Sequence, residues 1–318
     1  MGRIMTDTTR EIFKKHEVRK TKDQRKLFRD YVISYARSLG YGAKEERVGK
    51  HAYNVVVGDP RSASVIYTAH YDTCAVMPLP NFITPKNILI YLIYQVIMTT
   101  VIFTIPFIVM FGVAPRVYDA TGMYLVYIGV MIVGYALLLL TFYLIMKGPA
   151  NKHTANDNTS GVTLLTELLT EMPEEQRGKV AFVFFDLEEL GMIGSKSFKH
   201  RYPTVSKRTP VVNFDCVSDG DHIMVAASKE ARASYGQALD DAFVPTEEKS
   251  ILLSNAEKVY YPSDQAMFRQ GVAVAALKKA PIVGYYMDRI HTHRDTVFDK
   301  ANIKLLCESI LKLLKTIA

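Results

Sequence analysis

Acidic residues and histidines recur in this sequence directly after short apolar segments that are typical of buried strands. SVIYTA is followed by His70-Tyr71-Asp72, KVAFVFFD by Leu187-Glu188-Glu189, VVNF by Asp215, and IVGYYMDRI by His291. A fifth group, Asn156-Asp157-Asn158, stands where a helix is expected to begin. Because open α/β sheets bind ligands at the carboxyl ends of their strands, these five segments are candidates for one common cleft.

Imidazole and carboxylate groups in this combination can bind divalent metal ions. Two histidines and three carboxylates suit two borderline ions with one carboxylate bridging them, and a further glutamate stays free as a base. Two ions about 3.5–4 Å apart can activate a water molecule and stabilise a tetrahedral intermediate. Taken singly, each group has a structural alternative: His70-Tyr71-Asp72 could be a chance surface pair, Asp157 a helix N-cap, Glu188-Glu189 a solvated pair, Asp215 a turn residue and His291 a surface histidine. The prediction of a two-metal site therefore rests on the whole set.

The segments that would position these residues alternate between strands and helices. Strands are expected at 54–57, 64–69, 179–185, 211–214, 222–226, 272–276 and 282–286, and helices at 21–39, 160–171 and 300–317. This alternation predicts an α/β fold with a mixed, largely parallel central sheet flanked by helices. Residues 1–86 are too few to form it alone, so we expect 1–86 and 147–318 to fold together as one discontinuous domain.

Residues 87–146 contain only one Arg and one Asp. Two uncharged apolar runs, 87–115 and 120–146, each exceed the about 20 residues that cross a bilayer core as a helix. We therefore expect a transmembrane hairpin inserted into the domain, with helices at about 87–113 and 123–146 and a connector of roughly 114–122. The alternative is a pair of buried core helices, which rarely run so long without a charged face.

The formal net charge of +7 lies entirely in the N-terminal quarter of the chain. Residues 1–86 hold 16 Lys or Arg against nine Asp or Glu, whereas residues 147–318 hold 22 of each sign. Positive segments tend to stay on the cytoplasmic side, so we expect a protein integral to the cytoplasmic membrane with both flanks of the hairpin facing the cytoplasm. The basic segment 11–29 is either a contact for anionic lipid headgroups or a solvated charged helix. The first residues lack a charged stretch followed by an apolar run, so no signal peptide is expected.

Several other classes of protein are excluded by composition and pattern. Near-average apolar and charged fractions exclude disordered, collagen-like and disulfide-scaffold classes. Cys74, Cys216 and Cys307 are widely spaced and odd in number, which favours reduced thiols. No nucleic-acid-binding module accompanies the basic segment. Two helices without an intramembrane charge offer no ion path for a transporter.

Five motifs, in order along the chain, resemble those of the co-catalytic dizinc aminopeptidases. This zinc peptidase superfamily includes bacterial leucyl aminopeptidases and the glutamate carboxypeptidase-like and transferrin-receptor-like proteins. The motifs are AHYDT (69–73), ANDNTSG (155–161), DLEELG (186–191), NFDCV (213–217) and IHTHRDT (290–296). YPSDQAMFRQGVAV (261–274) is similar to the family's Ser-Asp segment before a late core strand. The resemblance covers nearly all of the chain outside the hairpin.

The resemblance implies a role for each matched residue. One zinc ion would be held by His70, Asp157 and Asp215, and a second by Asp157, Glu189 and His291, with Asp157 as the bridge. Glu188 would be the general base that carries a proton from the attacking water to the leaving amine, and Asp72 would orient His70. The family match falls on His291 rather than on His293, and His153 has no role in it. Cobalt or manganese could replace zinc.

The chain departs from the family pattern between its first two motifs. Asp72 and Asp157 are separated by 84 residues, most of them in the hairpin, and only ten residues separate Met146 from Asp157. At about 3.5 Å per residue this tether spans no more than about 40 Å, so the active site should lie close to the bilayer. We hypothesise that peptides reach it at the membrane surface, for example hydrophobic remnants of signal peptides. Replacing residues 84–149 by a soluble loop tests this hypothesis. It would be refuted if the variant still cleaved soluble and membrane-associated peptides equally well.

The resulting expectation is a membrane-anchored zinc aminopeptidase that acts on peptides. A carboxypeptidase, a dipeptidase or a glutaminyl cyclase-like enzyme would keep the same metals with another specificity. A catalytically inactive receptor or scaffold is a third alternative, but such relatives usually lose ligands or the base, and here all six positions are occupied. Gly129 and Gly134 present small faces for helix contact, which would allow a homo-oligomer.

Overall fold

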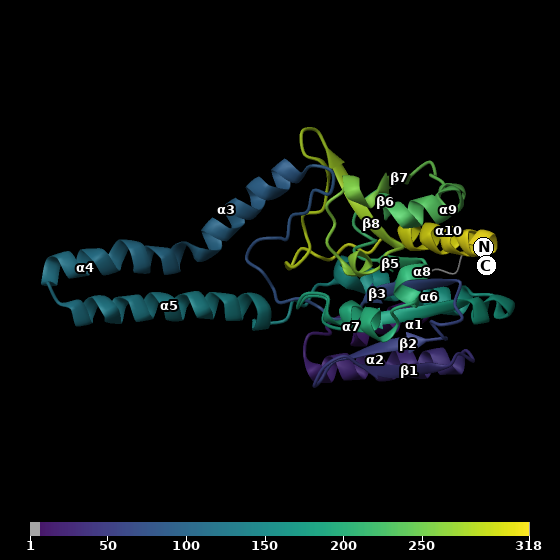
Figure 1. Ribbon diagram of the computed structural model, residues 1–318, viewed down its shortest axis with the longest axis horizontal. Helices are drawn as coiled ribbons and strands as arrows, with labels where there is room; N and C mark the ends of the chain where they lie inside the picture. The colour runs from purple at the N-terminus through teal and green to yellow at the C-terminus, as the bar shows by residue number, and fades with distance from the viewer. Residues whose placement is uncertain (1–6, 318) are drawn as a thin grey trace.

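A nine-stranded mixed sheet forms the centre of the computed structural model, which describes residues 7–317 (Figure 1). The strands are β1 (Ala43–Arg47), β2 (Tyr53–Val57), β3 (Val65–His70), β4 (Val180–Phe185), β5 (Val211–Phe214), β6 (His222–Ala227), β7 (Ser250–Asn255), β8 (Gly271–Ala280) and β9 (Gly284–Tyr286). Their order is β1-β2-β4-β3-β5-β8-β6-β7, with β9 paired to β8. The four central strands β4, β3, β5 and β8 run parallel, whereas β2 and β6 join them antiparallel. The predicted mixed, largely parallel sheet is confirmed.

Helices cover both faces of this sheet. One face packs against α2 (Lys22–Ser38), α6 (Gly161–Glu171), α9 (Lys229–Ala242) and α10 (Lys300–Ile317), and the other against α7 (Ile193–Arg201) and α8 (Val205–Arg208). In β4, Phe182 and Phe184 belong to the first core and Ala181, Val183 and Phe185 to the second. Because both faces are buried, this strand is apolar throughout instead of alternating with polar residues.

Several elements differ from the expected pattern. The expected strand at 282–286 begins only at Gly284, because residues 281–283 form the turn that reverses the chain from β8. Strand β8 is longer than expected and extends to Ala280. Helix α1 (Asp7–Lys15), β1, α7, α9 and β7 were not anticipated. Strand β1 reads AKEER, a charged edge strand that carries almost no apolar signal.

An arm of apolar helices projects away from the α/β body (Figure 1). Helix α3 (Ile88–Phe107) continues through a π-helical segment (Ile108–Val113) into α4 (Ala114–Thr121), and α5 (Tyr124–Lys147) returns after a turn at Gly122, where φ is +65°. The expected connector at 114–122 is therefore mostly helical, and the first helix extends beyond 113. The π-helical segment directly follows Pro106, which cannot donate a backbone hydrogen bond.

The two helical runs of the arm, Ile88–Thr121 and Tyr124–Lys147, are long and apolar enough to cross a membrane, with a mean hydropathy of 2.4 in each best window. Only 11% and 6% of those windows is buried, so the alternative of two soluble core helices is wrong. The helices pack on each other, with the rings of Phe103 and Phe142 5.0 Å apart. Gly134 allows the closest approach, since a Cβ there would lie 2.2 Å from Cγ of Met110.

The base of the arm is bonded to the body. Val76 N–H donates to Pro149 C=O at 2.9 Å, and Asn151 N–H donates to Cys74 C=O at 3.2 Å. On the other side, Ile83 and Met287 form an isolated antiparallel bridge. These contacts attach both ends of the arm to the body, close to the segment that follows β3.

Candidate active site

Three neighbouring strands of the sheet carry candidate site residues at their carboxyl ends. His70 ends β3, Glu188 and Glu189 follow β4, and Asp215 follows β5. Because β3 lies between β4 and β5, these residues meet at the carboxyl ends of these three central strands. His70 Nε2 lies 3.4 Å from Asp215 Oδ1.

Asp157 lies between the two histidines. Its Oδ1 is 3.4 Å from His70 Nε2, and its Oδ2 is 3.1 Å from His291 Nε2. The flanking asparagines fix this position: Asn158 Nδ2 donates to Phe214 C=O at 2.9 Å, and Asn156 Oδ1 accepts the N–H of Ser218 at 2.8 Å. The Asn-Asp-Asn segment thereby joins the start of α6 to the end of β5, with the carboxylate directed between two imidazoles.

The donor atoms of His70, Asp157 and Asp215 form one group, and those of Cys74, Glu189 and His291 form a second. Glu189 Oε2 lies 3.3 Å from His291 Nε2, while buried Glu189 Oε1 has no hydrogen-bond partner within residues 7–317. The donor atoms of Cys74, Glu189 and His291 all lie within 4.8 Å of one another, and the Cys74 thiol is buried. A buried carboxylate oxygen without a partner is a costly arrangement that a bound cation would relieve.

Asp72 supports the site mainly through the loop after β4. Its carboxylate accepts the N–H of Glu188 at 2.9 Å and the N–H of Glu189 at 3.2 Å. His70 Nδ1 lies 3.1 Å from the backbone oxygen of Asp72 and 3.7 Å from its carboxylate. Asp72 therefore positions both the histidine and the two glutamates.

The spacing of carboxylate oxygens around His70 and His291 suits zinc. Two ligands each about 2.0–2.1 Å from a tetrahedral zinc ion are about 3.3 Å apart, which matches the 3.1–3.4 Å from His70 to Asp157 and Asp215 and from His291 to Asp157 and Glu189. The ligands would be His70, Asp157 and Asp215 for one ion, and Asp157, Glu189 and His291 for the other.

Electrostatics also favour a cation here. Burial opposes protonation of His291, but Glu189 and Asp157 outweigh it and raise its pKa to about 9. Burial and the nearby Asp157 raise the pKa of Glu189 to about 8, against the opposing effect of His291. Burial, together with Asp264 and Glu189, raises the pKa of Glu188 well above its usual value, against the effect of His70. These shifts reflect an excess of buried carboxylates that a divalent ion would neutralise.

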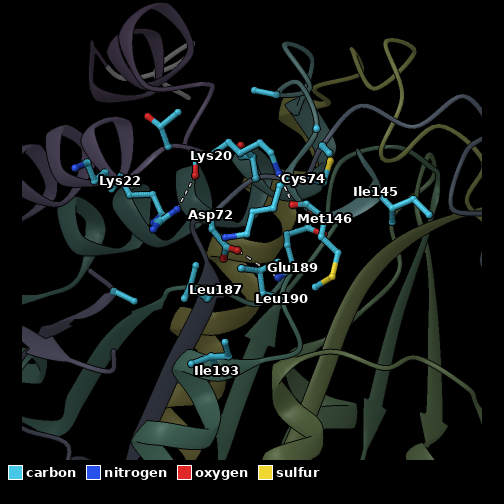
Figure 2. A pocket seen from close by; sticks show the side chains of 18 of the residues that line it. Lys20, Lys22, Asp72, Cys74, Ile145, Met146, Leu187, Glu189, Leu190 and Ile193 are labelled. Carbon is cyan, nitrogen blue, oxygen red and sulfur yellow. Dashed lines mark hydrogen bonds between the residues drawn. The ribbon is translucent and has the colours of Figure 1, made fainter. Parts of the chain in front are cut away.

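Two adjoining cavities open at these strand ends. A cavity of about 230 Å³ is lined by His70, Asp157, Glu188, Glu189, Asp215 and His291. Beside it lies a larger pocket of about 770 Å³, whose lining includes Asp72, Cys74, Glu189 and residues 145–147 at the end of α5 (Figure 2). The candidate site thus adjoins the base of the apolar arm.

All seven candidate site residues from the sequence lie in this region: His70, Asp72, Asp157, Glu188, Glu189, Asp215 and His291. His153 and His293 lie exposed on the surface. Two contributors were not anticipated. Asp295 accepts the N–H of Asn156 at 2.8 Å and that of Asp157 at 2.9 Å, and Cys74 adjoins Glu189 and His291. Asp295 stands within the IHTHRDT motif, whereas Cys74 carries no spacing signal.

Solved structures with the same fold include an aminopeptidase, glutaminyl cyclases and a Zn-dependent exopeptidase. The LapA aminopeptidase of Legionella pneumophila matches with a TM-score of 0.58 at 12% identity, over 96% of this chain and 69% of that one. A glutaminyl cyclase of Porphyromonas gingivalis matches with a TM-score of 0.58 at 13% identity, over 98% and 96%. A Zn-dependent exopeptidase of Parabacteroides distasonis matches with a TM-score of 0.57 at 12% identity, over 96% and 97%. No curated protein matches the chain.

A family description matches the sequence itself. The pattern of peptidase family M28 matches residues 139–313, more than half of the chain. The match begins within α5, after the segment that carries His70 and Asp72, as expected when an insertion separates the first motif from the rest. The chain belongs to peptidase family M28, within the superfamily of dizinc aminopeptidases that its motifs resemble.

Proposed function

We propose that this protein is a membrane-anchored zinc aminopeptidase that removes N-terminal residues from peptides with the help of two metal ions. Membership of the M28 family makes it a metallopeptidase with zinc as its metal. The observation that carries the two-ion proposal is the position of Asp157, with one carboxylate oxygen toward His70 and the other toward His291.

Zinc held by these residues would act as a Lewis acid that polarises the scissile carbonyl and lowers the pKa of a water molecule. Glu188 shares the cavity with His70, Asp157 and Asp215, within reach of a water placed there. Its carboxylate would take the proton from the attacking water and deliver it to the leaving amine. Asp72 would hold Glu188 in place through the backbone N–H that it accepts.

The base is tested by replacing Glu188 with Gln, which keeps the shape but removes the proton acceptor. We expect kcat to fall by about 10²–10⁴-fold while the zinc content per chain stays unchanged. Metal analysis and steady-state kinetics on the same preparation measure both quantities. A Glu188→Gln enzyme with its zinc and with wild-type kcat would refute the mechanism.

The direction of cleavage is tested with matched peptides that carry either a free or an acetylated N-terminus. Cleavage restricted to free N-termini supports the aminopeptidase. Cleavage of acetylated peptides from the other end would identify a carboxypeptidase. Cyclisation of peptides that begin with Gln would identify the reaction named for the glutaminyl cyclases that share this fold.

Membrane anchoring is supported by the arm. Its helices are apolar and largely exposed, and their charged residues lie at the two ends of the arm: Arg116 and Asp119 near the far turn, and Lys147 at the base. The basic residues of 7–86 and the base of the arm lie on the same body, which favours placing the catalytic body on the cytoplasmic side with membrane lipid around the helices.

A further inference from the structure

The pocket of about 770 Å³ beside the candidate metal site is lined by basic side chains, here called its basic wall, of which Lys20 and Lys22 are labelled in Figure 2. Its lining contains five Lys or Arg side chains, which come from the start of α2, the loop after β1 and the end of α5: Lys20, Lys22, Arg25, Lys50 and Lys147. Among the residues that the structure describes, its acidic lining consists of Asp72 and Glu189. The Asp72 carboxylate accepts two backbone N–H groups, and Glu189 Oε2 lies beside His291.

Two of the five cations have partners within the protein. Arg25 Nε lies 2.9 Å from Asp186 Oδ1. Lys20 Nζ donates to the backbone oxygen of Met146 at 3.1 Å, which ties the start of α2 to the end of α5 (Figure 2). These contacts hold the wall together.

The other three cations are unpaired. Lys22, Lys50 and Lys147 are exposed, and in the part of the chain from 7 to 317 none of them makes an ion pair or a side-chain hydrogen bond. Three ammonium groups from three separate segments therefore border one pocket without a counter-ion. Such a wall raises the local concentration of anionic ligands.

The rest of the lining is largely apolar. Met77, Leu187, Leu190 and Ile193 contribute side chains from the body, and Ile145 and Met146 contribute from α5. A volume of about 770 Å³ falls in the range of about 300–1,000 Å³ that is typical of small-molecule sites. The pocket therefore suits a short apolar segment that carries a negative charge, rather than a folded protein.

We infer that this pocket binds the remainder of a short peptide whose first residue lies at the metal site, and that Lys22, Lys50 and Lys147 bind its C-terminal carboxylate. The inference rests on the proposed aminopeptidase and names its substrates as short, apolar peptides with a free C-terminus. A lipid phosphate is a weaker match, because the pocket also contains Glu189 and His291 of the candidate metal site, beside which the first residue of a peptide would lie.

The test compares the tripeptide Leu-Ala-Leu with its C-terminal amide. For the wild-type enzyme at low salt, we expect the KM of the free acid to be about tenfold lower than that of the amide, with kcat within about twofold. The triple variant Lys22→Gln, Lys50→Gln, Lys147→Gln should raise the KM of the acid about tenfold and leave that of the amide unchanged. The control Lys300→Gln, on α10 outside this pocket, should change neither.

Binding is measured in parallel by titration calorimetry on the zinc-loaded Glu188→Gln protein, with and without the three lysine changes. The binding measurement tests the inference even if neither peptide is cleaved. Absence of cleavage would count against the proposed function alone. Equal affinity for acid and amide in the variant with intact lysines would overturn the inference. It would also be overturned if the lysine changes abolished binding to vesicles of anionic lipid while the preference for the acid persisted.

Discussion

Asp157 is the residue on which the proposed metal site depends most. Its two oxygens contact different histidines, and its backbone N–H is held by Asp295. Replacing a residue that holds a metal ligand in position by hydrogen bonds commonly lowers metal affinity by about 10–100-fold. The arrangement explains why the pattern Asn-Asp-Asn is needed, since each asparagine bonds a different part of the backbone around the site.

The two histidines of the IHTHRDT motif allow a matched test of the ligand set. Replacing His291 with Ala should lower the zinc content from about two ions per chain to about one and reduce kcat strongly, because His291 Nε2 faces both Asp157 and Glu189. Replacing His293, which is exposed two residues later, should leave both quantities unchanged. Zinc content by atomic absorption and kcat on a leucine anilide are the measurements. Zinc lost from the His293 variant and kept by the His291 variant would reverse the assignment.

At the residue scale, the sequence predicted which side chains would lie together. Ordered motifs identify residues whose chemistry is specific, and the structure brings all seven candidates to one region. Cys74 could not be found in this way, because nothing in the spacing of a single cysteine shows that the loop after β3 turns it toward Glu189 and His291. Asp295 was hidden for a different reason: it acts through backbone hydrogen bonds, which a motif does not distinguish from a surface aspartate.

At the scale of elements, apolar periodicity predicted the buried strands but did not predict elements that face solvent on one side. Strands β3, β4 and β5 are apolar because both of their faces are covered, so their sequence reflects their place in the sheet. Strand β1 and helix α9 face solvent on one side and are rich in charged and small residues, which local patterns do not separate from loops. The helical continuation of α3 into α4 was missed because Pro115, Arg116 and Asp119 suggest a loop.

Two glycines of α5 provide a matched test of the packing within the arm. Replacing Gly134 with Leu should destabilise the hairpin by about 1–3 kcal/mol, because the new side chain would overlap Met110. Replacing Gly129 with Leu should have little effect, since no atom lies within 4 Å of a Cβ built there. Thermal unfolding in detergent would show a lower Tm for the Gly134 variant alone. Equal Tm values for both variants would mean that the two helices do not pack as described.

At the scale of the whole molecule, the apolar arm and the α/β body must lie in different solvents if the arm spans a bilayer. The first helical run contains 34 residues, about 51 Å at 1.5 Å per residue, which exceeds the about 30 Å of a bilayer core. Its last turns carry Arg116 and Asp119 and would therefore lie beyond the hydrocarbon on the far side. The proposed topology places only this end of the arm outside.

Cysteine labelling tests this topology, because all three native cysteines are buried. In intact cells, a membrane-impermeant maleimide should label an Asp119→Cys variant and leave a Ser62→Cys variant on the body unlabelled. After the cells are broken, both variants should react, since Ser62 is also exposed. Labelling of Ser62→Cys in intact cells would place the catalytic body outside and contradict the proposed orientation.

The position of β3 in the sheet sets an order of events during synthesis of the chain. Within residues 7–317 this strand pairs with β4 and β5 alone, and both lie after the arm in the sequence. A growing chain that has just produced β3 therefore has no partner for it until both apolar helices have left the ribosome. His70 likewise meets Asp157 and Asp215 only after that point. The chain consequently cannot assemble its candidate metal site before both apolar helices have been made, so newly made protein should be inert until those helices are available for the proposed insertion.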